Sequence, residues 1–422
     1  MAASLMACGS SATDVSYRTL PPPEATHPIG FSHLFGFAEM GNGVVLVTDP
    51  REGGVFALDA GLRTRRMVGR QGAGPLEYTS PGILHQFGAD SAYQVDLGAR
   101  RWLVIGRDSV VAHTAVDSGS SPTLDLVLGA DSLGRLLRMR TPRITAGGST
   151  VSTADSALLV LVNAQDARGD TIARLRMSAP LDPGKEWGSF WDAEQAFLAL
   201  DGWVAVVRRE PYRVDWRSPE GRWTFGAPII PGERPFGRAE REHFLANSVT
   251  TALAAGWEAR MHWLPSVPAV GFQFSWRAAT RDGHLVLKRQ ATVGMPDGTY
   301  DVIDRRGRVV DRLRLPAGSW ILGFGAAHVY VVAEDEDGLQ FLSKHPWGAD
   351  RAACCPAGGS AARDNSRVWR NPGGPRDEAR RFCPDSAGVE SFVRAGAVLR
   401  HAARDAGPVL RPGRLDRHDG AR

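Results

Sequence analysis

The sequence predicts an all-β protein, a six-bladed β-propeller with a helical insertion between blades four and five and a disordered C-terminal tail. The first observation is a repeated unit: an apolar strand (Val44–Val47), an alternating strand that ends in Asp and a glycine turn (Val55–Gly61), and a third strand (Arg65–Val68). A sheet of this size cannot bury both faces alone, so repeated copies indicate stacking around an axis. The second observation is the content of 48 Gly and 27 Pro, which is typical of many short strands and turns.

The Asp-and-glycine pattern recurs along the chain. Asp and Asn suit such positions because their side chains accept hydrogen bonds from backbone amides two residues on. The further copies are Tyr93–Gly98, Tyr212–Asp215 with Gly221, Tyr300–Asp304 with Gly307, and a looser copy at Leu159–Asn163 with Gly169.

A sixth unit comprises Ser319–Phe324, His328–Val332 and Leu339–Leu342, and no outermost strand follows it. We expect the N-terminus to supply that strand, and Asp14–Leu20 is the candidate. The 319 residues from Ile29 to Trp347 allow six blades at roughly 40 to 50 residues each.

Two segments depart from the strand pattern. Pro235–Ala255 places Leu245, Val249 and Leu253 on one helical face, which predicts the helical insertion. From Gly348 the sequence is rich in Ala, Arg, Gly and Pro and has no sustained period, which predicts disorder or an out-of-frame translation. The predicted organisation is therefore a truncated signal and tether (1–28), a propeller (29–347) and a low-complexity tail (348–422).

The segment Leu5–Ser11 has the form of a bacterial lipoprotein processing site, in which Cys8 would carry the lipid. Only seven residues precede Cys8, without the basic and apolar regions of a full signal peptide. Either translation begins upstream, or Cys8 is an inert thiol. The first alternative predicts an extracytoplasmic protein of the periplasm or cell envelope that is anchored to the membrane through Cys8.

Net charge argues against a nucleic-acid partner. The whole chain carries +4, but residues 348–422 hold fourteen Arg against nine acidic residues, a net charge of +5, which leaves −1 for the rest. The predicted propeller thus lacks the overall basic character of a nucleic-acid-binding domain. The remaining cysteines, Cys354, Cys355 and Cys383, all lie in the tail, so the core uses no disulfide.

The run Gly69–Tyr78 (Gly-Arg-Gln-Gly-Ala-Gly-Pro-Leu-Glu-Tyr) resembles the run after the first blade of bacterial six-bladed propellers related to the NHL-repeat group. Leu76 replaces a glycine of that family pattern, and Tyr78 stands for Phe. Tyr300–Arg308 is similar to the family's penultimate blade. The resemblance implies the propeller fold over about residues 30 to 347, and lipoprotein and secreted forms are common in the group. It does not imply one activity, because propellers carry unrelated functions on one scaffold.

Several local patterns have the composition of binding sites, but each has a structural interpretation. The glycine run lacks the Gly-Lys-Ser/Thr ending of a phosphate-binding loop, so we expect turns. The acidic run Glu334–Gly338 is expected at a hairpin tip, where it lacks the ligand spread of a calcium loop. None of the eleven histidines shows zinc-site spacing, and surface or packed roles are expected for His33, His85, His262, His284 and His328.

Tryptophans crowd the middle of the chain, and most are expected to pack between blades. A subset at one mouth of the channel, with arginines such as Arg208, Arg209 and Arg213, is a candidate sugar- or peptide-binding surface. The tryptophans concerned are Trp187, Trp191, Trp203, Trp216, Trp223, Trp257, Trp263 and Trp276.

The sequence therefore predicts an extracytoplasmic, lipid-anchored, monomeric binding or interaction module. Its partner would be a small molecule, a glycan, a peptide or an envelope protein. The alternative is a metal-dependent lactonase- or lyase-like enzyme with a site at the central channel. No catalytic, metal-binding or cofactor-binding residue is assigned, and the cofactor is left open. Cys8, as a lipidation site, is the single residue with a predicted role.

Overall fold

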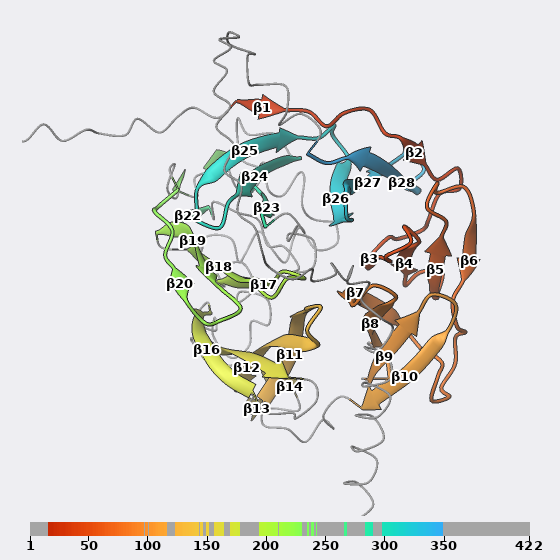
Figure 1. Ribbon diagram of the computed structural model, residues 1–422, viewed down its shortest axis with the longest axis horizontal. Helices are drawn as coiled ribbons and strands as arrows, with labels where there is room; N and C mark the ends of the chain where they lie inside the picture. Colours follow the sequence, from red (N-terminus) through yellow and green to blue (C-terminus); the bar gives the residue numbers. More distant parts are fainter. Residues whose placement is uncertain are drawn as a thin grey trace, which may run out of the picture. The chain divides into compact units, whose positions relative to one another are not determined.

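Six four-stranded sheets surround a common axis in the computed structural model, and the predicted all-β propeller is confirmed (Figure 1). The structure describes residues 16–348 with internal gaps, the longest being 178–193, 243–265 and 268–282. All described residues belong to the first of two units, Met1–Ala361; the second, Ala362–Arg422, lies outside them. Cys8 and the predicted tail beyond Gly348 are also outside the described residues.

The first three blades follow one another in sequence, each with its lowest-numbered strand nearest the axis (Figure 1). Blade 1 contains β3 (Phe37–Glu39), β4 (Val45–Asp49), β5 (Gly54–Leu58) and β6 (Arg65–Met67). Blade 2 contains β7 (Pro81–Phe87), β8 (Ser91–Asp96), β9 (Arg101–Gly106) and β10 (Val110–Ala115). Blade 3 contains β11 (Thr123–Ala130), β12 (Arg135–Pro142), β15 (Ser156–Asn163) and β16 (Gly169–Arg176).

The last three blades include both strands from the N-terminal segment. Blade 4 contains β17 (Gln195–Leu198), β18 (Val204–Arg209), β19 (Tyr212–Arg217) and β20 (Trp223–Thr224). Blade 5 contains β23 (Leu285–Lys288), β24 (Thr299–Ile303), β25 (Val309–Arg314) and β1 (Tyr17–Arg18). Blade 6 contains β26 (Ser319–Phe324), β27 (His328–Glu334), β28 (Gln340–Pro346) and β2 (Ala25–Thr26).

The blades bury both faces against their neighbours, which explains why strands such as β4 are apolar at successive positions. Val45 and Val47 pack in a cluster with Leu322 and Tyr330 of blade 6, whereas Leu46, between them, packs in a cluster with Leu84 of blade 2. Alternate residues of a strand point to opposite faces. Each fully buried aliphatic side chain contributes roughly 1.5–3 kcal/mol, so the inter-blade clusters hold the ring together.

The N-terminal segment closes the ring, but not through the strand predicted. The prediction that Asp14–Leu20 supplies the outermost strand of the sixth blade is wrong: that strand is β2, which pairs antiparallel with β28. β1, inside the predicted segment, pairs parallel with β25 of blade 5 instead. A two-residue strand carries too little alternation to be located from sequence, and its register depends on contacts some 300 residues away.

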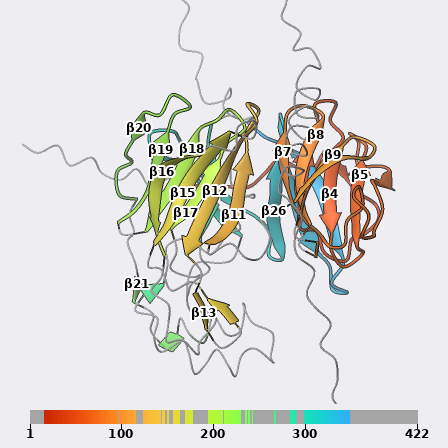
Figure 2. The same ribbon diagram turned by 90° about the horizontal axis from the view of Figure 1, so that it is seen from below.

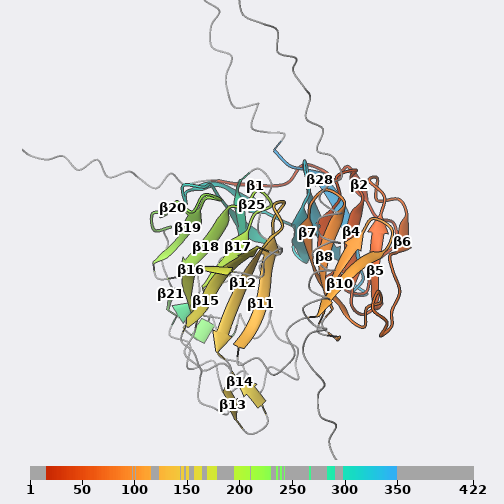
Figure 3. The ribbon, with the colours of Figure 1, turned by 60° about the horizontal axis from the view of Figure 1, so that its bottom comes forward.

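The connections between strands differ at the two ends of blades 3 to 5. At the turn end, hairpins close in short turns with a glycine at positive φ, as in Asp131–Gly134 and Asp304–Gly307. At the opposite end of blades 3 to 5, the insertion end, β12 ends, β18 meets β19 and β23 ends. The short hairpins β13–β14 (Ile144–Ala146, Ser149–Val151) and β21–β22 (Arg234–Pro235, Ser266–Val267) extend beyond the blades there (Figures 2 and 3).

The predicted helical insertion falls mostly outside the described residues. Within Pro235–Ala255, Arg238, Ala239 and Glu242 are helical, and Arg238 forms an ion pair with Glu242 one turn later (2.7 Å). Over the described ranges, no helix has the length and apolar character needed to span a bilayer.

The joint between blades 2 and 3 is packed differently from the others. Five hydrophobic clusters join the remaining neighbouring blades, and none joins these two within the described residues. Instead, His85 of β7 lies opposite Tyr93 of β8 on the side of blade 2 that faces away from blade 1. His85 is buried, its Nε2 has no hydrogen-bond partner among the described residues, and burial lowers its pKa to about 4.

Candidate binding face at the insertion end of blades 3 to 5

Basic residues from three blades gather at the insertion end because successive strands finish or begin there. Among the described residues they outnumber the acidic side chains at the same strand ends, which are Glu194, Asp215, Asp301 and Asp311. The basic residues are Arg174 and Arg176 of β16, Arg208, Arg209 and Arg213 of the β18–β19 hairpin, Lys288 and Arg289 at the end of β23, and Arg312 and Arg314 of β25.

In blade 4, a buried carboxylate holds two of these arginines. The Asp215 side chain is 1% exposed, and Arg208 Nε and Arg213 Nε donate to it at 3.1 and 2.9 Å. Arg208 also donates through Nη1 to Glu194 Oε2 (2.7 Å) and to the carbonyl of Arg174 (3.0 Å). These bonds fix the guanidinium groups at the end of the hairpin and tie blade 4 to the last strand of blade 3.

Blade 5 repeats the arrangement one blade further round the ring. Asp301 accepts from Arg289 Nη1 (2.9 Å) and from Arg312 Nε (3.2 Å), and its side chain is 1% exposed. Tyr212 of blade 4 packs in the cluster that joins blades 4 and 5. Burial, and then the negative charge of Asp301, raise the pKa of its hydroxyl.

Two of the arginines singled out from the sequence, Arg208 and Arg213, are therefore held in ion pairs with Asp215. Arg209 lies beside them at the end of β18. The exposed members of the face are Arg174, Arg176 and Arg314, which the sequence reasoning missed. Their signal was the recurrence of Arg in the last residues of strands, in Arg174-Leu-Arg176 and Arg312-Leu-Arg314, but only the ring brings those strand ends together.

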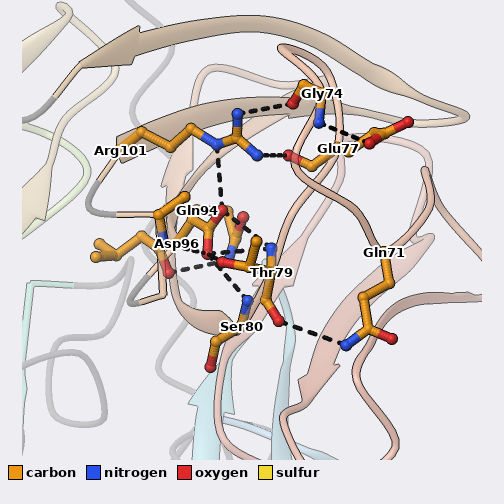
Figure 4. Close-up of polar contacts among 10 residues, drawn as sticks. Gln71, Gly74, Glu77, Thr79, Ser80, Gln94, Asp96 and Arg101 are labelled. Atoms are coloured by element: carbon orange, nitrogen blue, oxygen red, sulfur yellow. Dashed lines mark hydrogen bonds and ion pairs between the residues drawn. The ribbon is translucent and has the colours of Figure 1, made fainter.

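The glycine-rich run forms turns between blades 1 and 2, as expected, and Figure 4 shows what holds it. Asp96, fully buried, accepts hydrogen bonds from Thr79 N, Thr79 Oγ1 (2.8 Å) and Ser80 N (3.0 Å). Arg101 donates to Asp96 (3.2 Å) and through its other nitrogens to the carbonyls of Gly74 and Glu77. The amide of Gly74 in turn donates to the Glu77 side chain (2.7 Å). These bonds hold the loop against blade 2, and we call Asp96, Arg101 and the loop groups bonded to them the latch.

The acidic run and the tryptophans have structural roles where the structure describes them. Glu334–Gly338 is the β27–β28 hairpin tip, where Asp335 accepts from the amides of Asp337 and Leu339. Trp216 is buried in the blade 4–5 cluster, with Trp203 packed against it, and Trp223 packs against the blade 3–4 cluster. The remaining tryptophans of the candidate subset, Trp187, Trp191, Trp257, Trp263 and Trp276, lie outside the described residues.

The histidines are scattered rather than gathered. His85 is buried, and His33, His284 and His328 are partly buried, with His328 Nε2 2.9 Å from Glu24; His262 lies outside the described residues. Among the described residues, no three His, Cys, Asp or Glu side chains are grouped as metal ligands would be.

Comparisons with known proteins do not show a family to which the chain belongs. No family model matches it, and no curated protein matches its sequence. Among solved structures, regucalcin from Agrobacterium tumefaciens, a calcium-binding protein, is similar at 12% identity and a TM-score of 0.41, over 78% of this chain and 97% of that one. Virginiamycin B lyase from Staphylococcus aureus is similar at 8% identity and a TM-score of 0.37, over 76% and 98% of the two chains.

Proposed function

We propose that this propeller is an extracytoplasmic binding module, monomeric, that holds an anionic ligand at the insertion end of blades 3 to 5. One observation carries the proposal: cationic side chains from three blades gather at one end of the propeller, although residues 1–347 carry a net charge of only −1. Clustered like charges on one face raise the local concentration of oppositely charged ligands. Acidic glycans and acidic peptides have that chemistry, and a nucleic acid does not fit the overall charge of the fold.

Removing charge from this face is expected to weaken ligand binding. The triple variant Arg174→Gln, Arg176→Gln, Arg314→Gln should bind polygalacturonate, a carboxylate polymer, roughly tenfold more weakly than the parent, since each exposed charge contributes about 0.5 kcal/mol. The dissociation constant of the purified protein, measured by titration at two salt concentrations, checks this. Binding by the parent should also weaken as salt rises.

The matched control removes three exposed arginines from the turn end, Arg63→Gln, Arg222→Gln and Arg306→Gln. It lowers the net charge equally and is expected to leave the dissociation constant within twofold of the parent. Equal losses in the two variants would mean that overall charge, and not this face, attracts the polymer, and the proposal would fail.

The module would be tethered to the membrane through a lipid on Cys8. The local pattern Leu5–Ser11 supports this proposal, and the tether would run from Cys8 to β1 on the outer edge of blade 5. A palmitate analogue fed to cells that express the gene with its upstream region should label the protein. Cys8→Ser should abolish the label, and an unlabelled parent would refute the anchor.

A metal-dependent lactonase or lyase remains the alternative function, with ligands drawn from separate blades at the channel. No group of described residues favours it. Metal analysis of the purified protein separates the two proposals, since a stoichiometric divalent ion would favour the enzyme.

A further inference from the structure

Two buried hydrogen-bond donors lie at the joint between blades 4 and 5, and neither has a partner among the described residues. They are the hydroxyl of Tyr212 and Nε of Arg289, whose residues are 4% and 5% exposed. An unpaired buried donor is costly, and most such groups in proteins are satisfied by protein, water or ligand. Tyr212 is the first residue of β19 and Arg289 directly follows β23, so both donors lie at the insertion end.

The surroundings of the two donors favour an acceptor group as ligand. Arg289 directs Nη1 to Asp301, which leaves the Nε edge of its guanidinium for another acceptor. Arg312 donates to the same carboxylate, so Asp301 is shared between two arginines. The Tyr212 hydroxyl interacts electrostatically with all three groups.

We propose that Tyr212 and Arg289 form a subsite for a carboxylate of the anionic ligand, an inference that rests on the proposed function and deepens it. One carboxylate oxygen would accept from Arg289 Nε and the other from the Tyr212 hydroxyl. A carboxylate suits these two donors, because a side-on guanidinium edge favours a planar anionic acceptor. A dianion would be disfavoured by Asp301 in the same cluster.

Tyr212→Phe tests the subsite without removing a bond from the free protein. Replacing sodium chloride by sodium acetate at constant ionic strength should raise the melting temperature of the parent, because a ligand that binds only the folded state stabilises it. Tyr212→Phe should keep or raise the melting temperature in chloride and bind acetate about tenfold more weakly. Arg289→Lys, which keeps the charge opposite Asp301 but lacks the Nε edge, should weaken acetate binding similarly.

Tyr300→Phe is the matched control. Tyr300 is equally buried in blade 5, but its hydroxyl accepts a hydrogen bond from Ile321 N (3.2 Å). This variant should melt at a lower temperature and yet keep the full acetate-dependent rise. If Tyr212→Phe also keeps the full rise, or if the parent shows none, the subsite is refuted. A larger rise with inorganic phosphate than with acetate would refute the carboxylate assignment.

Two further probes distinguish the source of the carboxylate. A rise with N-acetyl-L-alanine larger than that with D-glucuronate would assign the subsite to a peptide terminus, and the reverse to a sugar acid; either rise supports the subsite. Loss of acetate binding in the face variant of Arg174, Arg176 and Arg314 is not expected. Failure of the acetate test with intact polygalacturonate binding would therefore refute the subsite alone, and not the proposed function.

Discussion

Replacing Asp96 with alanine is expected to lower the free energy of unfolding by about 3–5 kcal/mol, the usual cost of removing one partner of a buried ion pair. Asp96 is fully buried and joins Arg101 to the loop that links blades 1 and 2. Without it, Nε of Arg101, whose side chain is 11% exposed, and the amide of Ser80 lose their acceptor. Denaturant unfolding of the parent and the variant measures the difference.

The same network sets the pKa of the Asp96 carboxyl. Burial alone would raise that pKa, but hydrogen bonds from Ser80, Thr79 and Ala99 outweigh it, so the pKa lies below the ordinary value. The stability that Asp96 contributes is therefore present at neutral pH and is lost as pH falls through the folded-state pKa.

Asp59→Ala is the matched control for Asp96→Ala. Asp59 accepts bonds from the amides of Gly61, Arg63 and Thr64 and from the Thr64 hydroxyl, but it lies in an exposed turn, and no described arginine side chain forms an ion pair with it. Its loss is expected to cost about 1 kcal/mol, the usual net contribution of a hydrogen-bonded turn side chain. Similar losses in the two variants would contradict the claim that the buried latch, rather than the repeated turn aspartate, stabilises the blade joint.

The second large effect is a loss of stability between pH 6.5 and pH 4 that depends on His85. Burial lowers the pKa of His85 from 6.5 to about 4, so the folded protein keeps this imidazole neutral where the unfolded chain binds a proton. The unfolded state is then favoured as pH falls, and the stability fully present above pH 6.5 declines by about 3 kcal/mol by pH 4. Unfolding measured at pH 7, 6, 5 and 4 traces this decline.

His85→Leu removes the titrating group while it keeps an apolar side chain of similar size at the blade 2–3 joint. The variant should lack this part of the decline, so its stability relative to the parent should rise steadily from pH 6.5 to pH 4. His113→Gln, an exposed histidine on β10, should follow the parent. A parallel decline in parent and His85→Leu would show that His85 is not kept neutral by the fold.

Much of the fold could be predicted because its signals are local. The copy Val55–Gly61 contains its own strand and turn signals, and Asp59 closes that turn through bonds to residues within five positions. The double burial of β4 likewise follows from its continuous apolar run. Such units can be recognised from their own sequence alone, and their number then implies a ring of blades.

The parts that sequence reasoning missed depend on contacts between distant residues. β1 and β2 are two residues long, so nothing in their own sequence distinguishes a strand of blade 5 from a strand of blade 6. The residues of the candidate face are also far apart in the sequence. Arg176 and Arg314 come from different blades and lie on one face only when the ring is closed. Likewise, a missing hydrogen-bond partner, as at Tyr212, is visible only once its surroundings are known.

Hydrogen exchange with and without polygalacturonate tests the central claim, that the insertion end of blades 3 to 5 is the binding face, most directly. Slower exchange is expected in peptides that cover Arg174–Arg176 and Arg208–Arg213, with no change in the turn-end segments around Arg63, Arg222 and Arg306. Protection confined to the turn end, or spread evenly over both ends, would contradict it.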